Sequence, residues 1–231
     1  MINNIQILDN IVLSNKVVDD FYTKYNTDAE FKAWLDCTIP QIAKCEAQQQ
    51  NNPWHKYNVL GHILHSVEEM NQQTATLPND TRRMLAYVML FHDIGKPDCH
   101  IVREKNGQMI DSFFNHNVRS CEIAKEILPK LNFTAKEVKV MAKLVYKHDI
   151  FMFIKECKTN NPHWRVLTNE LIQEEINDLN KVGEGKTLLK YLIMVGRSDN
   201  LAQNERMTGE SLKMLAKFDR MLQGYKSTYT K

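Results

Sequence analysis

Apolar residues recur along most of the chain at the three- and four-residue spacing of an amphipathic helix, which buries one helical face. The clearest example is the segment 57–74, whose apolar face is formed by Val59, Leu60, Ile63, Val67 and Met70. A second apolar run, 84–91, follows a turn at 77–80 in which Asp80 is suited to cap a helix over 82–93. This patterning predicts a protein built mainly from helices.

The same spacing predicts further helices at 28–34, 41–50, 117–131, 134–148, 166–177, 187–201 and 209–225. Between them, the segment 101–110 has short apolar ends around Asn106-Gly107, a residue pair favoured in tight hairpin turns. We therefore expect one small two-stranded β-hairpin within an otherwise all-α fold. The polar tail, 226–231, is expected to fray.

The chain shows no internal repeat, low-complexity tract or linker, so a single structural domain is expected. Within it, N-terminal helices (1–50) should pack on a core formed by 51–205, and 206–231 should form a C-terminal helix and tail. A length of 231 residues fits one such domain, and an apolar fraction of 43% excludes a disordered chain. Only 8 glycines and 6 prolines favour long helices over a loop-rich all-β fold.

Charge and cysteine content narrow the partners and the compartment. A net charge of +2 gives no strong nucleic-acid patch and no argument for membrane binding. The 5 cysteines are scattered without a Cys-x-x-Cys pair, which is typical of reduced thiols. The first residues lack the shape of a signal peptide, and no apolar stretch approaches the ~20 residues that cross a membrane. We expect a cytoplasmic protein with no membrane partner; an oligomer stays open but has no support in the sequence.

The candidate chemistry centres on His92-Asp93, which ends the apolar run 84–91. Gly95, which we expect to stop the helix, and Lys96, whose ammonium group suits a phosphate, follow directly. A buried run that ends in two metal-binding side chains and a phosphate-binding lysine is difficult to explain by packing alone.

Other His and Asp residues stand near the ends of separate predicted helices: His62, His116, His148 and Asp199. Helical domains assemble interior metal sites from side chains of different helices, and imidazole and carboxylate donors suit divalent transition metals. Together with the doublet there are enough donors for two ions about 3.5–4 Å apart that share Asp93. For two of these residues there is an alternative: His116 caps its helix, and His148 is stabilised at a helix C-terminus.

Several neighbouring residues have two interpretations. His65, one turn after His62, either supports the site or packs in the core. Asp149 either orients His148 or accepts from solvent. Trp54 either anchors packing or lines a pocket mouth, where it would stack a base.

The ordered motifs are Asn52-Pro-Trp-His-Lys-Tyr-Asn-Val-Leu-Gly-His62, Leu90-Phe-His-Asp-Ile-Gly-Lys-Pro97, the Asn-Gly hairpin, Phe113-Phe-Asn-His116 and Arg197-Ser-Asp-Asn200. This set resembles the HD superfamily of metal-dependent phosphohydrolases. Over about 53–204 it is similar to the HD domain attached to bacterial tRNA nucleotidyltransferases, the CCA-adding enzymes. The Gly-rich strand and paired carboxylates of the nucleotidyltransferase head have no counterpart before Asn51, so we expect no nucleotide addition to tRNA.

The resemblance implies an HD-type helical domain in which each motif residue has a role. The residues that match the four-ligand core are His62, His92, Asp93 and Asp199. The positions that bind a second metal in binuclear members are matched by His116 and His148. Lys96 matches a lysine that often faces the phosphate, so Asp93 and Lys96 are the expected catalytic residues. Candidate substrate-binding residues are Lys96, Arg119, Arg197 and His55, with Lys147 as a further basic candidate.

The implied activity is hydrolysis of a phosphomonoester or phosphodiester by metal-activated water. The expected substrate is nucleotide-like, a small nucleotide or the phosphate at an RNA end, and 2′,3′-cyclic phosphodiesterase or phosphatase activity is favoured. The expected cofactors are two divalent metal ions, with Mn, Fe, Ni, Co, Zn and Mg not distinguished. Two alternatives stay open: a mononuclear 5′-nucleotidase-type phosphatase that uses the four-ligand core only, and a non-catalytic RNA-binding or signalling module of the same fold.

Overall fold

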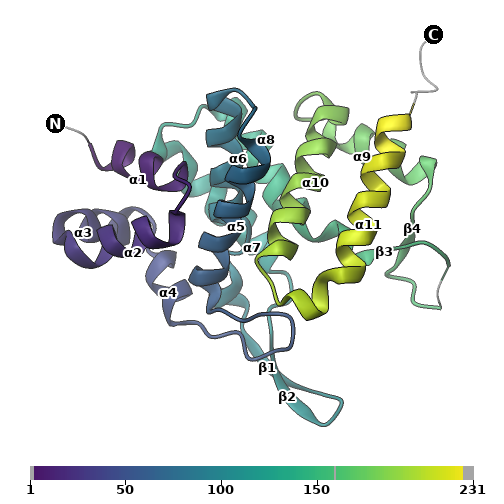
Figure 1. The fold of residues 1–231 in the computed structure, drawn as a ribbon, viewed down its shortest axis with the longest axis horizontal. Coiled ribbons are helices and arrows are strands. Elements are labelled where there is room, and N and C mark those ends of the chain that lie inside the picture. The colour runs from purple at the N-terminus through teal and green to yellow at the C-terminus, as the bar shows by residue number, and fades with distance from the viewer. Residues whose placement is uncertain (1–2, 159, 226–231) are drawn as a thin grey trace.

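The computed structural model describes residues 3–158 and 160–225 of the chain. These ranges hold eleven α-helices, three short 3-10 helices and four short strands (Figure 1). The α-helices are α1 (Asn4–Val12), α2 (Val17–Thr27), α3 (Ala29–Thr38), α4 (Gln41–Ala47), α5 (Val59–Thr74), α6 (Asn79–His92), α7 (His116–Ile127), α8 (Ala135–Lys147), α9 (Asn169–Leu179), α10 (Gly185–Leu201) and α11 (Glu205–Gly224). The other elements are η1 (Lys96–Cys99), η2 (Leu128–Leu131), η3 (His148–Phe153), β1 (Ile101–Lys105), β2 (Gln108–Ser112), β3 (Ile154–Lys155) and β4 (Arg165–Val166). The all-α class with a small hairpin is confirmed, and the tail predicted to fray, 226–231, lies outside the described residues.

Helix α6 lies at the centre of the fold. Every residue from Leu85 to His92 is buried, and α6 contacts α1, α5, α7, α8 and α10. Helix α5 contacts both α6 and α10, and its predicted apolar face is fully buried. The buried apolar side chains form one core that extends from Leu8 to Leu222. The core is therefore continuous across the predicted boundaries near residues 50 and 205. The division of the chain at these boundaries stays a prediction.

Side-chain caps fix where two of the site-bearing helices begin. The side-chain oxygen of Asn58 accepts a hydrogen bond from the backbone N–H of Gly61 at 2.7 Å, which starts α5. Helix α8 starts with a capping box, in which the side chains of Thr134 and Glu137 each accept from the other's backbone N–H. The residues at which these two helices begin are therefore determined by the local sequence.

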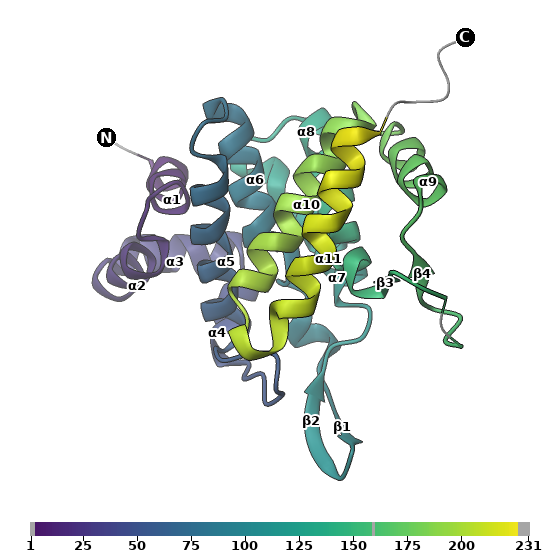
Figure 2. The same ribbon diagram turned by 45° about the vertical axis from the view of Figure 1, so that its right-hand side comes forward.

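The predicted hairpin is confirmed by β1 and β2, which pair antiparallel. Asn106 and Gly107 both have positive φ angles, 52° and 78°, as a tight type I′ turn requires. The hairpin projects from the end of the helical body at which α5 begins and α10 ends (Figures 1 and 2). Its base is fixed by Asp111, whose Oδ2 accepts from the N and Nδ2 of Asn51 at 2.7 and 2.9 Å.

Three predicted helix starts are wrong. Helix α11 begins at Glu205 behind an Asn204 cap, four residues before the predicted start at Gly209. Helix α6 begins at Asn79, so Asp80 lies in its first turn and is not the cap, although the helix dipole still favours a carboxylate there. Val166 belongs to β4, which pairs parallel with β3, and α9 begins three residues later behind a Thr168 cap. A two-residue strand is too short for a periodic pattern to reveal. Among the described helices, none has both the length and the apolar character needed to cross a membrane.

Candidate metal centre

Four buried side chains from the ends of three helices meet near the base of the hairpin. His62 lies in the first turn of α5, His92 and Asp93 end α6, and Asp199 lies near the end of α10. Nε2 of His62 lies 3.2 Å from Asp93 Oδ2, 3.0 Å from Asp199 Oδ1 and 3.3 Å from Nε2 of His92. Nε2 of His92 lies 3.3 Å from Asp93 Oδ2 and 3.7 Å from Asp199 Oδ1. We call these four donor atoms the first set.

A second set of donors adjoins the first at Asp93. His116 is the first residue of α7, with Asn115 in the cap position, and His148 directly follows α8. Their Nε2 atoms lie 3.1 Å apart, and they lie 3.1 and 3.5 Å from Asp93 Oδ1. Asp93 therefore presents Oδ2 to the first set and Oδ1 to the second, which is the geometry of a carboxylate that bridges two cations.

The separations within each set fit the coordination sphere of a divalent metal ion. Ligand atoms about 2.0–2.2 Å from an ion lie about 2.8–3.6 Å from one another in octahedral or tetrahedral arrangements. The separations that involve a histidine are 3.0–3.7 Å in the first set, and the three separations in the second set are 3.1–3.5 Å. The structure thus brings all six predicted ligands together, as one group of four and one of three that share Asp93. Each group could hold a metal ion.

Hydrogen bonds to the backbone fix the tautomer of three of the four histidines. Nδ1 of His92, His116 and His148 lies 2.6–2.7 Å from the carbonyl oxygen of the residue three positions earlier. A carbonyl only accepts, so each Nδ1 donates and each Nε2 is directed into the centre. In His62, Nδ1 lies 3.5 Å from the carbonyl oxygen of Ala202. The rings are therefore oriented for Nε2 ligation before any ion binds.

Without a metal ion, nearby carboxylates favour the protonated forms of His92 and His116. Burial acts to lower the pKa of His92, but Asp93 and Asp199 offset it and raise the pKa to about 10. Burial also opposes the shift at His116, where Asp149 and Asp93 raise the pKa to about 10. Burial alone would raise the pKa values of Asp93 and Asp199, but the facing imidazoles hold both well below the usual range. The centre is therefore buried and holds histidine protons that a bound divalent cation would displace.

Lys96 reaches the centre from η1 and is buried. Its Nζ lies 2.6 Å from Asp93 Oδ2, donates to Gln50 Oε1 at 2.9 Å, and lies 3.2 Å from Nε2 of His55. Because the ammonium group only donates, His55 accepts through Nε2, and its Nδ1 donates to Asn52 Oδ1 at 2.8 Å. Burial, and then the charge of Lys96, lower the pKa of His55 to about 2, so this imidazole is neutral.

Gly95 permits close packing between two elements and does not end a helix in the left-handed conformation. Its φ is −84°, which any residue adopts. A Cβ atom at this position would lie 2.6 Å from the backbone N of Ser120, so glycine permits α7 to approach. The backbone N–H of Gly95 donates to the Ser120 hydroxyl at 2.9 Å. The expected helix-stopping role is wrong, and the close contact between η1 and α7 is the physical reason for the glycine.

The other predicted basic residues lie outside the centre. Arg119 is 41% exposed and donates to Asp98 and Glu122 at 2.9 and 3.1 Å. Arg197 lies on the exposed side of α10, because residues two apart on a helix face different directions and Asp199 faces the core. Their role in substrate binding stays a prediction. Lys147 is committed to α9, where its Nζ pairs with Glu175 and Asp178.

Three residues at the centre carry no motif in the sequence: Gln50, Gln203 and Asp149. Gln203 Nε2 donates to Asp199 Oδ1 at 3.1 Å. Asp149 lies 3.1 Å from Nε2 of His116 and 3.4 Å from Nε2 of His148. Burial opposes the shift, but the two imidazoles lower the pKa of Asp149 to about 2. A glutamine at a helix end has no sequence signature; for Asp149, its place beside His148 was the available signal.

His65 proves to be a packing residue. Its ring stacks on Tyr57, with ring centres 4.1 Å apart, and its Nδ1 lies 3.4 Å from Glu68 Oε2. Although it follows His62 by one turn, it belongs to neither donor set. This decides between its two interpretations.

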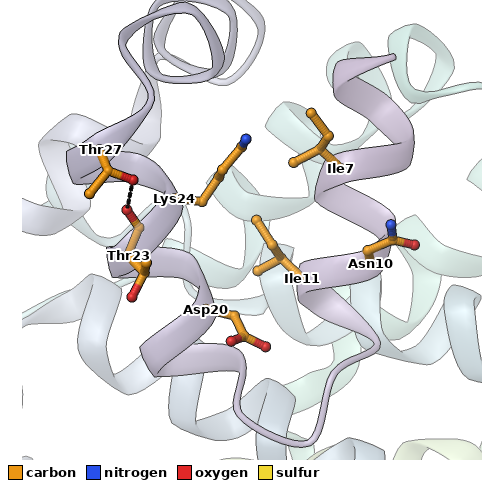
Figure 3. Close-up of a pocket in the computed structure, with 7 residues that line it drawn as sticks. All are labelled: Ile7, Asn10, Ile11, Asp20, Thr23, Lys24 and Thr27. Atoms are coloured by element: carbon orange, nitrogen blue, oxygen red, sulfur yellow. Dashed lines mark hydrogen bonds between the residues drawn. The ribbon is translucent and has the colours of Figure 1, made fainter. Parts of the chain in front are cut away.

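A hollow between α1 and α2 is separate from this centre (Figure 3). Its volume is about 370 Å³, and it is lined by Ile7, Asn10, Ile11, Asp20, Thr23, Lys24 and Thr27. The hydroxyl of Thr27 donates to the carbonyl oxygen of Thr23 at 2.7 Å. The lining holds one carboxylate and no imidazole, so it lacks the donors of a metal site.

Comparison with known proteins relates part of the chain to nucleotide-transferring enzymes. No protein-family profile matches it. Over 114 residues, 49% of the chain, it is 30% identical to an A-adding tRNA nucleotidyltransferase from Deinococcus radiodurans, of which 25% is covered. Over 124 residues, 48% of the chain, it is 30% identical to a bifunctional uridylyltransferase/uridylyl-removing enzyme from Azospirillum brasilense, of which 12% is covered. The chain thus spans a small part of each relative, and its buried His/Asp cluster is compatible with an HD-like site.

Proposed function

We propose that the chain is a metal-dependent phosphohydrolase that cleaves a phosphomonoester or phosphodiester of a nucleotide-like substrate. The observation that carries the proposal is the position of Asp93, whose two oxygens lie 3.1–3.5 Å from histidine nitrogens of two separate donor sets. Two divalent ions about 3.5–4 Å apart form a clamp that stabilises both the attacking and the leaving oxygen at phosphorus. The bridging geometry thus favours phosphoryl chemistry over a purely structural metal site.

The residues that would hold the ions are His62, His92, Asp93 and Asp199 in the first set and Asp93, His116 and His148 in the second. Bound divalent ions supply Lewis acidity toward phosphoryl oxygens and make hydroxide available near neutral pH. The chain itself supplies fixed ligands, because backbone carbonyls hold three of the imidazoles and Gln203 holds Asp199. Little reorganisation is then needed when the substrate binds.

Lys96 is the side chain best placed to stabilise negative charge on the substrate. Its three N–H groups face Asp93, Gln50 and His55. Asp93 Oδ2 is also one of the donor atoms that would hold a cation, which would neutralise this oxygen in place of the ammonium group. Lys96 would then be available to donate to a phosphoryl oxygen, in a buried position where such a contact is strong. His55 and Gln50 keep its ammonium group directed toward the centre.

The relatives support a nucleotide as the organic part of the substrate. Both names describe transfer of nucleotidyl groups, and one also describes uridylyl removal. Removal of a nucleotidyl group by water breaks a bond at phosphorus, the reaction class proposed for this chain. We favour a 2′,3′-cyclic phosphodiester or a phosphomonoester, at a small nucleotide or an RNA end.

A panel of esters and metals tests the proposal. Protein purified without chelator is assayed with bis-p-nitrophenyl phosphate, 2′,3′-cyclic nucleotides and nucleoside monophosphates in the presence of Mn²⁺, Ni²⁺, Co²⁺ or Mg²⁺. We expect metal-dependent hydrolysis that Asp93→Ala abolishes and Asp98→Ala retains, because Asp98 pairs with Lys44 and Arg119 outside the centre. If no ester is cleaved with any metal, the chain is a non-catalytic module. If Asp93→Ala cleaves as well as the wild type, the activity does not depend on this centre and the proposal is wrong.

A further inference from the structure

Two cation–aromatic pairs join the hairpin to the rim of the metal centre. Nζ of Lys105 lies 4.3 Å from the ring centre of Trp54. The guanidinium carbon of Arg103 lies 5.2 Å from the ring centre of Phe114. Both cations are on β1, whereas Trp54 belongs to the loop before α5 and Phe114 to the segment after β2. We call these four residues the hairpin wall.

Each aromatic residue of the hairpin wall adjoins a residue that contacts Lys96. Trp54 precedes His55, whose Nε2 lies 3.2 Å from Lys96 Nζ. Phe114 follows Phe113, whose ring centre lies 5.5 Å from the same Nζ. Both aromatic residues of the hairpin wall are therefore next in sequence to residues that lie against Lys96.

The hairpin wall is accessible, and its tryptophan is held in place. Phe114 is 58% exposed. The backbone N–H of Trp54 donates to Asn52 Oδ1 at 3.2 Å, and its carbonyl oxygen accepts from the N–H of Asn204 at 2.8 Å. The backbone of Trp54 is thus fixed to the turn that joins α10 to α11, and Lys105 lies over its ring. A ring held in this way loses little conformational freedom when a planar group stacks on it.

The strand geometry places the basic and the acidic side chains of β1 on opposite faces. Residues two apart on a strand share a face, so Arg103 and Lys105 lie on one face and Glu104 lies on the other. The face that carries the two aromatic contacts is therefore cationic. Aromatic rings beside lysine and arginine are the combination that binds a nucleobase together with its phosphate.

We propose that the hairpin wall is a nucleotide subsite, in which the base of the substrate stacks on Trp54 while its phosphate lies at the metal centre. This inference rests on the proposed phosphohydrolase function and states how the base of a nucleotide is recognised, which gives nucleotides a preference over phosphate esters without a base. Phe114 supplies a second aromatic surface, and Arg103 and Lys105 neutralise the phosphate on its approach.

Calorimetric titration of the purified protein with AMP and with ribose 5-phosphate tests the subsite, with phosphate release followed in the same samples. We expect AMP to bind about tenfold more tightly than ribose 5-phosphate, the contribution of one stacked base. Trp54→Ala should remove this preference, and Trp54→Phe, which retains a ring, should keep part of it. Trp164→Ala is the matched control, since Lys155 lies 4.2 Å over that ring on the separate β3–β4 segment.

The outcomes separate this inference from the function on which it rests. Equal affinity of the wild type for the two probes overturns the subsite, as does an unchanged preference in Trp54→Ala. Hydrolysis of esters without any preference for a base also overturns the subsite and leaves the phosphohydrolase proposal intact. Tight, Trp54-dependent binding of AMP supports the subsite even if no phosphate is released, in which case it is the hydrolase that fails.

Discussion

Nε2 of His116 lies 3.1 Å from Nε2 of His148, although both rings already use Nδ1 to donate to a backbone carbonyl. A neutral imidazole that donates through Nδ1 has only a lone pair at Nε2, and two lone pairs repel at this distance. A proton between the rings satisfies this one contact. A metal ion satisfies it and also Oδ1 of Asp93, which lies 3.1 and 3.5 Å from the two nitrogens. The histidine pair is therefore the most direct test of a second ion.

We expect His116→Ala to lower the metal content from two ions per chain to one, because the first set keeps all four of its donors. The measurement is elemental analysis of protein reconstituted with Mn²⁺ and freed of excess metal. His65→Ala is the control, since that ring stacks on Tyr57 and belongs to neither set. One ion in the wild type, unchanged by His116→Ala, would establish the mononuclear alternative.

We expect Lys96→Ala to lower kcat by about 100- to 1000-fold, the usual effect of removing a donor that stabilises charge in the transition state. Metal content should not change, because Lys96 contributes no ligand atom. Lys130→Ala is the matched basic control and should change kcat less than about threefold, since its exposed ion pair with Glu126 contributes little. If Lys96→Ala loses metal as well as activity, its role is to hold Asp93 and not to contact the phosphate.

The sequence predicted those features that depend on short-range patterns. The apolar face of α5 and the Asn106-Gly107 turn could be recognised because burial and a positive φ each select residue types locally. The six His and Asp positions were recognisable as an ordered set. Their division between the two oxygens of Asp93 was not, because it depends on how five helix ends are placed relative to one another.

The role of Gly95 and the place of Gln50 could not be predicted for the same reason, because both depend on long-range contacts. Gly95 was interpreted as a local helix stop, whereas its role is a contact with Ser120, 25 positions away. Gln50 supports Lys96 across 46 positions. Such long-range contacts have no periodic signal, since the residue type is selected by a partner that only the fold brings near.

We expect Gly95→Ala to destabilise the protein by about 1–3 kcal/mol, the usual cost of an overpacked contact. The new Cβ would meet backbone atoms of Ser120 and Arg119 at 2.6 and 2.9 Å, and backbone cannot move aside as a flexible side chain does. Gly209→Ala in α11 is the matched control. Apart from its chain neighbours and its own helix backbone, no atom of the described residues lies within 4 Å of its Cβ position, so there the substitution should stabilise the helix by about 0.5–1 kcal/mol. Urea unfolding of both variants measures the two effects, and equal stabilities would contradict the close contact.

The pH dependence of stability should differ between metal-free and metal-loaded protein. Facing carboxylates raise the pKa values of His92 and His116 from 6.5 to about 10, despite the opposing effect of burial. A pKa raised by folding gives stability that is fully present below pH 6.5 and is lost as the pH rises through about 10. We expect Tm in a chelator to fall across this window. Tm with Mn²⁺ should hold, because the ion replaces the protons. Calorimetry at both conditions checks this, and a level metal-free Tm would contradict it.

Asp149 faces both histidines of the second set from outside the compact group of donors. Its oxygens lie 3.1 Å from His116 Nε2 and 3.4 Å from His148 Nε2, yet it does not belong with Asp93 to one group of mutually close ligand atoms. A carboxylate in that position orients the imidazoles and adds negative charge beside the second ion. We expect Asp149→Asn, which keeps the shape and removes the charge, to lower the affinity for the second ion about 10- to 100-fold, the usual effect of losing such a supporting group. Asp199→Asn should instead lower the affinity of the first set for its ion. Mn²⁺ titrations followed by electron paramagnetic resonance distinguish the two, and an Asp149→Asn protein that binds both ions as the wild type does would limit Asp149 to balancing imidazolium charge.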